Sequence, residues 1–430
     1  MAMQAHATDL LQAYRDAQVY DSQFAGALAS REANREKSAQ GLAGLLPQVA
    51  ITGNSNRIEG SSSGTAFPGQ SRDIGYTSTT MQLQLQQPIY RPVNFNNYEQ
   101  SKLQVAAGEL QFEQAKIDLA LRVAQAYFDV LAAQDALIFI NAQKLAITEQ
   151  LASAKRNFEV GTATITDTHE AQARFDLATS QEIAAKSDLD VKQRALELLI
   201  GKAAPVLAPL SARLQLTPPE PAVLDKWVEE ARSVNPQVRA AEYGLTLAQQ
   251  EVVRNRGAHY PTLDAFAGVT RNASGVGTLG GPGTDINNRN IGLQLALPIY
   301  QGGLVDSRVR EAVANEEKAR QDLESARRGV ELQTRQNYVG VTSGIAQVRA
   351  LEAALTSSQS ALDSTRLGRE VGVRTQVDVL NAQQQLFSAR RDLAQAKYNY
   401  IMSTLKLKAS VGRLTEADVV AVNAWLERKP

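Results

Sequence analysis

Two ten-residue stretches alternate between apolar and polar positions. Residues 81–90 (MQLQLQQPIY) carry an apolar side chain at every second position from Met81 to Leu85, with glutamines between them. Residues 291–300 (IGLQLALPIY) alternate in the same way from Ile291 to Leu297. A period of two with one apolar face is typical of a β-strand. Both stretches end in Pro-Ile-Tyr, and proline suits a strand end because it lacks an N–H and fixes φ near the helical value. The sequence predicts two strands, each followed by a long helix.

A seven-residue apolar repeat runs through the long stretches that follow. It comprises Leu103, Leu110, Ile117, Ala124, Leu131, Ile138 and Leu145 in the first, and Val341, Val348, Leu355 and Leu362 in the second. The segments that return from each long stretch show a 4,3 spacing with many alanines, as in Ala382, Leu386, Ala389, Leu393 and Ala396. Such heptads predict long helices packed as coiled coils.

The order of these features occurs twice in the chain. Asn235 lies 214 residues after Asp21, Pro298 lies 210 after Pro88, and Gly372 lies 211 after Gly161. We therefore divide the chain into a first structural repeat (1–200), a proline-rich linker (201–221), a second repeat (222–411) and a C-terminal tail (412–430). The linker holds five of the 14 prolines, which indicates a segment running along a surface.

Each repeat is expected to follow the same plan. A helix (8–43, then 222–257) precedes a strand that starts near Pro47 or Pro261. A Gly/Ser/Asn-rich loop (54–75, then 271–290) leads to the second strand. A long helix (94–159, then 303–370), a tight turn and a second helix (167–200, then 378–411) complete the repeat.

Four strands of this length suit a tilted crossing of a bilayer, with polar loops on one side. Four strands cannot close a barrel, however, and unpaired strand edges are not tolerated in lipid. A membrane barrel would therefore be shared between chains. The alternatives are a small soluble sandwich for the strands and a soluble periplasmic coiled-coil adaptor or structural tether for the whole chain.

Composition excludes several classes of protein. The 430 residues carry 45 basic and 45 acidic side chains, which argues against a nucleic-acid partner. Cysteine is absent, so disulfides, thiolate metal sites and a cysteine nucleophile are excluded. We find no run of about 18 apolar residues that predicts a membrane-spanning helix.

Enzyme chemistry is not indicated either. The histidines His6, His169 and His259 lack the spacing of metal ligands. The glycine pattern at 275–280 lies in a predicted loop with no helix opening from it, unlike a dinucleotide-binding site. We expect a protein without catalytic activity, cofactor or metal.

The chain resembles the TolC family of outer membrane channels. Residues 371–383 (VGVRTQVDVLNAQ) are close to that family's G-x-R-T-x-x-D-V-L-x-A signature, residues 160–167 (VGTATITD) fit its partner turn, and residues 412–418 (GRLTEAD) also fit. The resemblance covers essentially the whole chain. It implies a mixed α and β membrane protein: a homotrimer whose 12-stranded β-barrel in outer membrane lipid continues into a 12-helix coiled-coil tunnel in the periplasm of a Gram-negative bacterium. It also implies export for type I secretion or efflux, with a periplasmic membrane fusion (adaptor) protein and an inner-membrane ABC or RND transporter as partners.

The resemblance places a gate at the two turns. Arg374 would pair with Thr166 and Asp167 of a neighbouring coil, and Asp378 would form an acidic ring at the mouth. The family's second acidic position is Asn381 here, and a tyrosine position of well-known members is Arg369. By position, the turn glycines Gly161 and Gly372 are expected to cap helices with φ > 0, and Asp167 with Glu170 forms a capping-box pattern. The prolines Pro47, Pro88, Pro261 and Pro298 are expected to mark the junction of barrel and tunnel.

Overall fold

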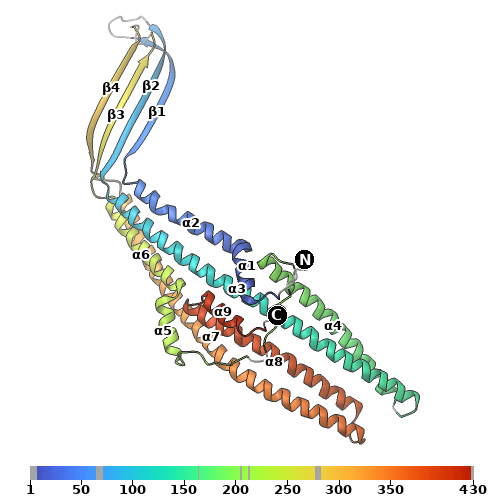
Figure 1. Ribbon diagram of the computed structural model, residues 1–430. Coiled ribbons are helices and arrows are strands. Elements are labelled where there is room, and N and C mark those ends of the chain that lie inside the picture. Colours follow the sequence, from blue (N-terminus) through green and yellow to red (C-terminus); the bar gives the residue numbers. More distant parts are fainter. Residues whose placement is uncertain are drawn as a thin grey trace, which may run out of the picture. The chain divides into compact units, whose positions relative to one another are not determined.

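The computed structural model describes residues 7–63, 71–162, 164–203, 206–211, 214–276 and 282–427. These residues fall into two compact units (Figure 1). Unit 1 comprises Met1–Ser30, Leu110–Ala240 and Glu324–Pro430, and unit 2 comprises Arg31–Glu109 and Ala241–Leu323. The elements are α1 (Leu10–Tyr20), α2 (Ser22–Ala43), β1 (Gln48–Ser63), β2 (Ser71–Tyr90), α3 (Pro92–Glu159), α4 (Ile165–Ile200), α5 (Leu224–Val234), α6 (Pro236–Gly257), β3 (Thr262–Ser274), β4 (Thr284–Ala296), α7 (Leu304–Glu370), α8 (Gln376–Val411) and α9 (Glu416–Asn423).

The two predicted leading helices are each interrupted once. The helix predicted over 8–43 ends at Tyr20 and restarts at Ser22, and the one predicted over 222–257 breaks at Asn235. Asp21 is 5% exposed, and its Oδ1 accepts the backbone N–H of Phe24 at 2.7 Å. Its carboxylate also receives two hydrogen bonds from the Arg122 guanidinium, at 2.9 and 3.0 Å. The break therefore begins α2 with a capped, charge-paired residue.

Asn235 occupies the corresponding position before α6. Its Oδ1 accepts the N–H of Gln237 at 2.8 Å, and its Nδ2 donates to the Ser410 carbonyl at 2.8 Å. Helix α6 thus has a cap like that of α2, but a neutral hydrogen bond to α8 takes the place of the ion pair. The capping bonds are local, but Arg122 and Ser410, which also hold the two break residues, lie on helices distant in sequence, so sequence periodicity could not show either break.

The four strands of unit 2 form one antiparallel sheet in the order β1-β2-β3-β4 (Figure 1). The predicted loops at 54–75 and 271–290 are wrong in extent, because pairing continues to Ser63↔Ser71 and to Ser274↔Thr284. Residues 275–276 and 282–283 lie outside the strands, as predicted. Residues 64–70 and 277–281 of those loops lie outside the described residues. Cross-strand pairing overrides the turn-like composition of these strand ends, because strand preference depends strongly on context.

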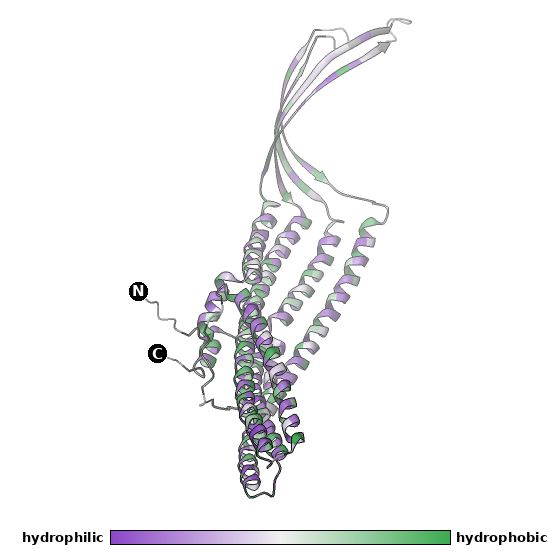
Figure 2. Cartoon of the chain, turned by 90° about the vertical axis from the view of Figure 1, so that its right-hand side faces the viewer, coloured by the Kyte–Doolittle hydropathy of each residue, from purple (hydrophilic) through white to green (hydrophobic). Residues whose placement is uncertain are grey.

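One face of the sheet is apolar. Ile51 lies opposite Leu83, which lies opposite Val269, and one pair further along the same face Val49 meets Leu85. These five side chains are 38–72% exposed in the single chain. In Figure 2 hydrophobic and hydrophilic residues alternate along the lower parts of the strands. The alternation predicted for residues 81–90 and 291–300 therefore yields a sheet with an uncovered apolar face.

The junction prolines are placed differently from one another. Pro47 and Pro261 precede β1 and β3, and Pro298 follows β4. Pro88 lies inside β2, where pairing with β3 continues to Tyr90 with a register shift. The expectation that both strands end at their Pro-Ile-Tyr is confirmed for β2, which ends at Tyr90, whereas β4 ends at Ala296, two residues before Pro298. Pairing with β1 stops at Gln86, so β2 is paired on one side only around Pro88, where a missing N–H is tolerated.

The heptad prediction holds for part of α3. Ile117, Ala124 and Leu131 are buried, but Ile138 and Leu145 are 60% and 64% exposed in the single chain. A straight α-helix drifts about 20° per heptad against a strict repeat, so a long stripe leaves the packed face. In α7, Val341, Val348 and Leu362 are buried as predicted.

Helix α3 corrects the expectation that the chain has no apolar stretch of about 18 residues. An 18-residue window within it has a mean hydropathy of 1.4, and 39% of that window is buried. By length and composition this single helix passes a test for a membrane span. Buried core helices pass the same test, so the window alone carries little weight.

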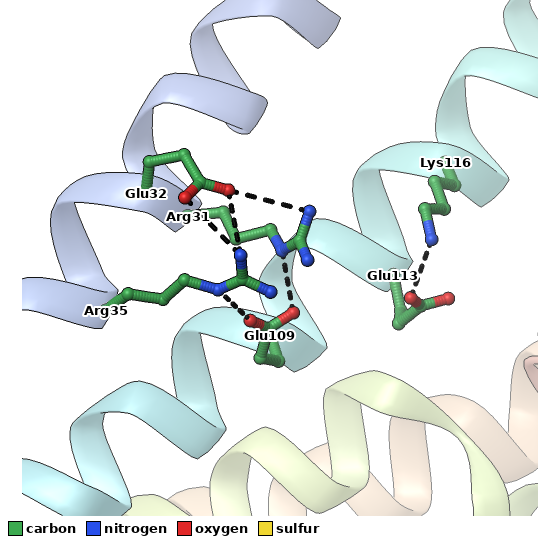
Figure 3. Close-up of polar contacts among 6 residues, drawn as sticks. All are labelled: Arg31, Glu32, Arg35, Glu109, Glu113 and Lys116. Atoms are coloured by element: carbon green, nitrogen blue, oxygen red, sulfur yellow. Dashed lines mark hydrogen bonds and ion pairs between the residues drawn. The ribbon is translucent and has the colours of Figure 1, made fainter.

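In unit 2, α2 is fixed to α3 by charged side chains (Figure 3). Glu109 accepts hydrogen bonds from Arg31 and Arg35, each at 2.8 Å, and Arg35 also contacts Glu32 at 3.1 Å. The two helices approach closely here: a Cβ added to Gly108 would lie only 2.8 Å from the side chain of Asn34, so glycine allows this approach. Figure 3 also shows the Glu113–Lys116 pair, one turn along α3, at 2.8 Å.

Candidate functional site

Two helix–turn–helix tips of unit 1 contain the predicted gate residues. The turn from α3 to α4 holds Gly161 with φ 77°, and the turn from α7 to α8 holds Gly372 with φ 80°. A Cβ on either glycine would meet no atom within 4 Å. Glycine is thus required by the left-handed backbone alone and not by close packing.

Each returning helix begins with a capping box. In α4 the Asp167 N–H donates to the Thr164 hydroxyl at 3.2 Å, and the Thr164 N–H donates to the Asp167 carboxylate at 3.0 Å. In α8 the same bonds join Thr375 and Asp378, at 3.2 and 2.9 Å. The expected box of Asp167 with Glu170 is therefore wrong, because α4 begins at Ile165 and Asp167 is the third residue of the helix, not its cap.

The pKa of Asp378 lies below its usual range. The backbone N–H of Thr375 is the largest cause, the Thr375 hydroxyl is the second, and the charge of Arg374 adds to both. Asp378 consequently stays ionised at the start of α8, where a negative charge is also favoured by the helix dipole.

The predicted gate pairs are not brought together within one chain. The side chain of Arg374 lies against Gly368, where an added Cβ would come 2.8 Å from Arg374 Cγ. Among the described residues, no ion pair or hydrogen bond joins Asp167 to Arg374 or to Arg369, and Thr166 is exposed. Pairing with a neighbouring coil stays a prediction.

Asn381 does have a partner within the chain, and sequence reasoning missed it. The Arg174 guanidinium on α4 donates to Asn381 Oδ1 at 2.8 Å and to Gln384 Oε1 at 3.1 Å, both on α8. Nearby, Gln150 of α3 donates to Gln383 of α8 at 2.7 Å. No motif indicated these contacts, because they join segments about 200 residues apart.

Apolar side chains pack beneath these polar contacts. Ile147, Ala178 and Leu380 are buried together, with Phe175 against them. Leu151, Ala154 and Ala171 form a second buried cluster, against which Phe175 also packs. The two helical hairpins of the chain, α3–α4 and α7–α8, therefore share a small core near the tips.

Further from the tip, two lysines form ion pairs with one carboxylate, that of Glu182. Glu182 of α4 accepts from Lys144 of α3 at 2.6 Å and from Lys186 at 2.5 Å. Hydrogen bonds from Lys144 and then Lys186 lower the pKa of Glu182 to about 2. This contact ties α4 to α3 within one hairpin.

The junction between sheet and helices in unit 2 is also tied by charge. Arg91, between β2 and α3, donates through Nε to Asp264 of β3 at 2.7 Å, and its Nη2 contacts the second carboxylate oxygen. Asp264 is 5% exposed. Gln87 donates to the Leu45 carbonyl at 3.0 Å. The junction is thus held by side chains beside the predicted prolines.

Comparison with known proteins identifies the family to which the chain belongs. The family model "Outer membrane efflux protein" matches residues 13–202 and 227–413. The chain is 34% identical to the alkaline protease secretion protein AprF of Pseudomonas aeruginosa, over 98% of this chain and 88% of that protein. It is 33% identical to the outer membrane protein TolC of Escherichia coli, over 99% and 86% of the two chains.

A solved structure, the CmeC outer membrane channel of Campylobacter jejuni, has a TM-score of 0.82 with 17% identity and covers 99% of this chain and 94% of its own. That likeness shows the shared fold. The sequence matches, which span nearly the whole chain at 30% identity or more, show the family. This chain therefore belongs to the outer membrane efflux protein family, whose members are channels of the Gram-negative outer membrane.

Proposed function

We propose that three copies of this chain form one channel, in which 12 strands close a barrel in outer membrane lipid and 12 helices form a periplasmic tunnel. The observation that carries the proposal is the four-stranded sheet, with an uncovered apolar face and free edges on β1 and β4. Lipid cannot satisfy the backbone groups of those edges, and pairing β1 of one copy with β4 of the next would satisfy them.

The oligomer has a direct test. Membranes are extracted with detergent, and the mass of the purified particle is measured by native mass spectrometry. We expect three chains of 46.6 kDa each. A water-soluble monomer obtained without detergent would overturn the proposal. It would also revive the soluble coiled-coil tether, which family membership otherwise sets aside.

The chain is further proposed to be an internal duplication, with repeats at 1–200 and 222–411, a linker at 201–221 and a tail at 412–430. The same order of two helices, two strands, a long helix and a returning helix supports it. The family model also matches in two segments, with a gap that overlaps the linker. Each trimer would then contain six similar hairpins around its axis.

The tips are proposed to gate the channel. Arg374, with Arg369 beside it, would pair with Thr166 and Asp167 of a neighbouring copy, and Asp378 would line the mouth as a single acidic ring, because its companion position is Asn381. The lack of any partner for Asp167 among these arginines within the chain supports contacts between copies. Three carboxylates around one axis favour cations.

Conductance in planar bilayers tests the gate. We expect Arg374→Ala combined with Asp167→Ala to raise single-channel conductance. The matched control is Arg194→Ala combined with Asp190→Ala, an exposed pair within α4 that joins no other helix. Equal conductance of the two double variants would contradict the gate.

Two relatives named for protease secretion, AprF and PrtF of Dickeya chrysanthemi, suggest a protein cargo. We propose export for type I secretion or efflux, with a periplasmic adaptor and an inner-membrane ABC or RND transporter supplying the energy. Deleting the gene and measuring secreted protease and drug sensitivity separates the two uses. The export role would be refuted if the reintroduced gene restored neither the secretion of protease nor the resistance to drugs.

A further inference from the structure

The two helical hairpins of one chain are joined by a polar cluster near their tips. The centre of the cluster is Arg174 on α4, seven residues, or about two helical turns, beyond Asp167. Its guanidinium reaches across to α8, with Nη2 2.8 Å from Asn381 Oδ1 and Nη1 3.1 Å from Gln384 Oε1. Glu170, one turn earlier on α4, forms an ion pair with Nη2 of the same guanidinium at 3.6 Å.

A second polar bond lies on the same interface. Gln150 of α3 donates to Gln383 of α8 at 2.7 Å, and Gln383 is 6% exposed. Ile147 of α3, Ala178 of α4 and Leu380 of α8 are buried together in one cluster. The bonds from Arg174 and Gln150, and the packing of Leu380 in this cluster, join the α3–α4 hairpin to the α7–α8 hairpin of the same chain.

We propose that Arg174, Asn381 and Gln384 form a latch that holds the second hairpin against the first in the closed channel, and that opening breaks it. The latch rests on the proposed gating, but it differs from the gate in its residues. Gate contacts would join neighbouring copies at the turns, whereas the latch joins the two halves of one chain.

The chemistry of the residues favours a latch that can be released. The two terminal nitrogens of a guanidinium form a rigid planar fork that can donate to two acceptors at once. A lysine ammonium does not reproduce this geometry. The acceptors are neutral amides, so the pair is weaker than a bond between guanidinium and carboxylate. Asn381 and Gln384 are exposed, so water can replace the bonds when the hairpins separate. Asparagine at 381 thus gives a contact of moderate strength.

Distances between the tips test the latch without relying on conductance. Val160 and Val371 lie in the two turns and are 72% and 67% exposed, and the chain has no cysteine. Val160→Cys with Val371→Cys therefore carries two spin labels per chain, and dilution with unlabelled chains leaves one labelled copy per particle. We expect Arg174→Ala to broaden the distribution toward longer distances and Arg174→Lys to do so less.

The matched control is Arg194→Ala, because the ion pairs that Arg194 makes within the described part of the chain are with Asp190 and Glu197 of its own helix. In the bilayer assay we expect Arg174→Ala to raise the probability of the wide state about tenfold over this control, which corresponds to about 1.4 kcal/mol. Asn381→Ala added to Arg174→Ala should have little further effect, because both remove the same bond.

Asn381→Asp separates the latch from a role of position 381 in the pore lining. A carboxylate would strengthen the bond to Arg174, so we expect a narrower distance distribution and fewer openings than in the wild type. A changed ion selectivity with an unaltered distribution would overturn the latch, as would identical distances in Arg174→Ala and Arg194→Ala. If no variant forms pores, the proposed channel gate fails, and the distance measurement still decides the latch.

Discussion

Replacing Asp21 tests how the first repeat is held together. Asp21 is 5% exposed, caps α2 through the Phe24 N–H, and receives two hydrogen bonds from Arg122. Asp21→Ala removes the cap and leaves the guanidinium without its anion. Asp21→Asn keeps a capping oxygen and removes only the charge, which reproduces the arrangement that Asn235 has before α6.

The structure sets the size of each effect. Loss of an N-cap costs about 1 kcal/mol. Loss of one partner of a fully buried ion pair costs about 3–5 kcal/mol, but the Arg122 side chain is 33% exposed and water screens it, so we expect about 1–2 kcal/mol here. Asp21→Ala should therefore lose about 2–3 kcal/mol, and Asp21→Asn about half of that.

Thermal unfolding in detergent, followed by tryptophan fluorescence, measures the loss. Both tryptophans, Trp227 and Trp425, lie in unit 1 with Asp21. At about 2–4 °C per kcal/mol for a unit of this size, we expect Tm to fall by about 5–10 °C in Asp21→Ala and by less in Asp21→Asn. A Tm equal to the wild type in both variants would refute the reasoning, and equal losses in both would refute the separation of cap from charge.

The pH dependence has a definite sign. Burial by itself would raise the pKa of Asp21, but hydrogen bonds from Arg122 and the Phe24 N–H outweigh it and lower the pKa. The stabilisation is therefore complete above the unfolded value of about 3.9 and is lost as the pH falls through the lower folded value. The Tm difference between wild type and Asp21→Asn should shrink on acidification below about pH 4, and a growing difference would contradict this sign.

Three further predictions concern other parts of the chain. Gly412→Ala should destabilise unit 1 more than Gly161→Ala in thermal unfolding. Both glycines have φ near +80°, but only a Cβ on Gly412 would meet another residue, at 2.6 Å. Equal losses of stability in the two variants would show that this close approach is irrelevant. Leu83→Lys should reduce assembly of the proposed barrel, scored as the heat-resistant oligomer on gels, because Leu83 lies on the apolar face that would meet lipid, where a lysine costs up to about 4 kcal/mol. Gln84→Lys on the opposite face is its control and should assemble normally. The carboxylate of Glu182, with its pKa lowered to about 2, should stabilise the chain fully above about pH 4.3 and lose this effect as the pH falls toward 2, so Glu182→Gln should approach wild-type Tm only at the acid end of that range.

The amino-acid sequence by itself determined the elements and their order. Period-two and heptad patterns located the strands and the long helices because each reflects which face of a local element is buried. The turn glycines and the 371–383 signature were equally local, since a backbone with φ > 0 or a helix start needs particular residues at particular positions. The repeated order of features, on which the proposed duplication rests, was also visible, because it is a property of the chain and not of its packing.

Only the tertiary structure decided how those elements meet. The breaks at Asp21 and Asn235 depend on Arg122 and Ser410, which come from other helices. The strand ends near Ser63 and Ser274 were missed because cross-strand partners, and not the residues themselves, make them extended. Arg174 and Asn381 gave no signal for the same physical reason: a bond between residues 207 positions apart leaves no periodicity in either segment.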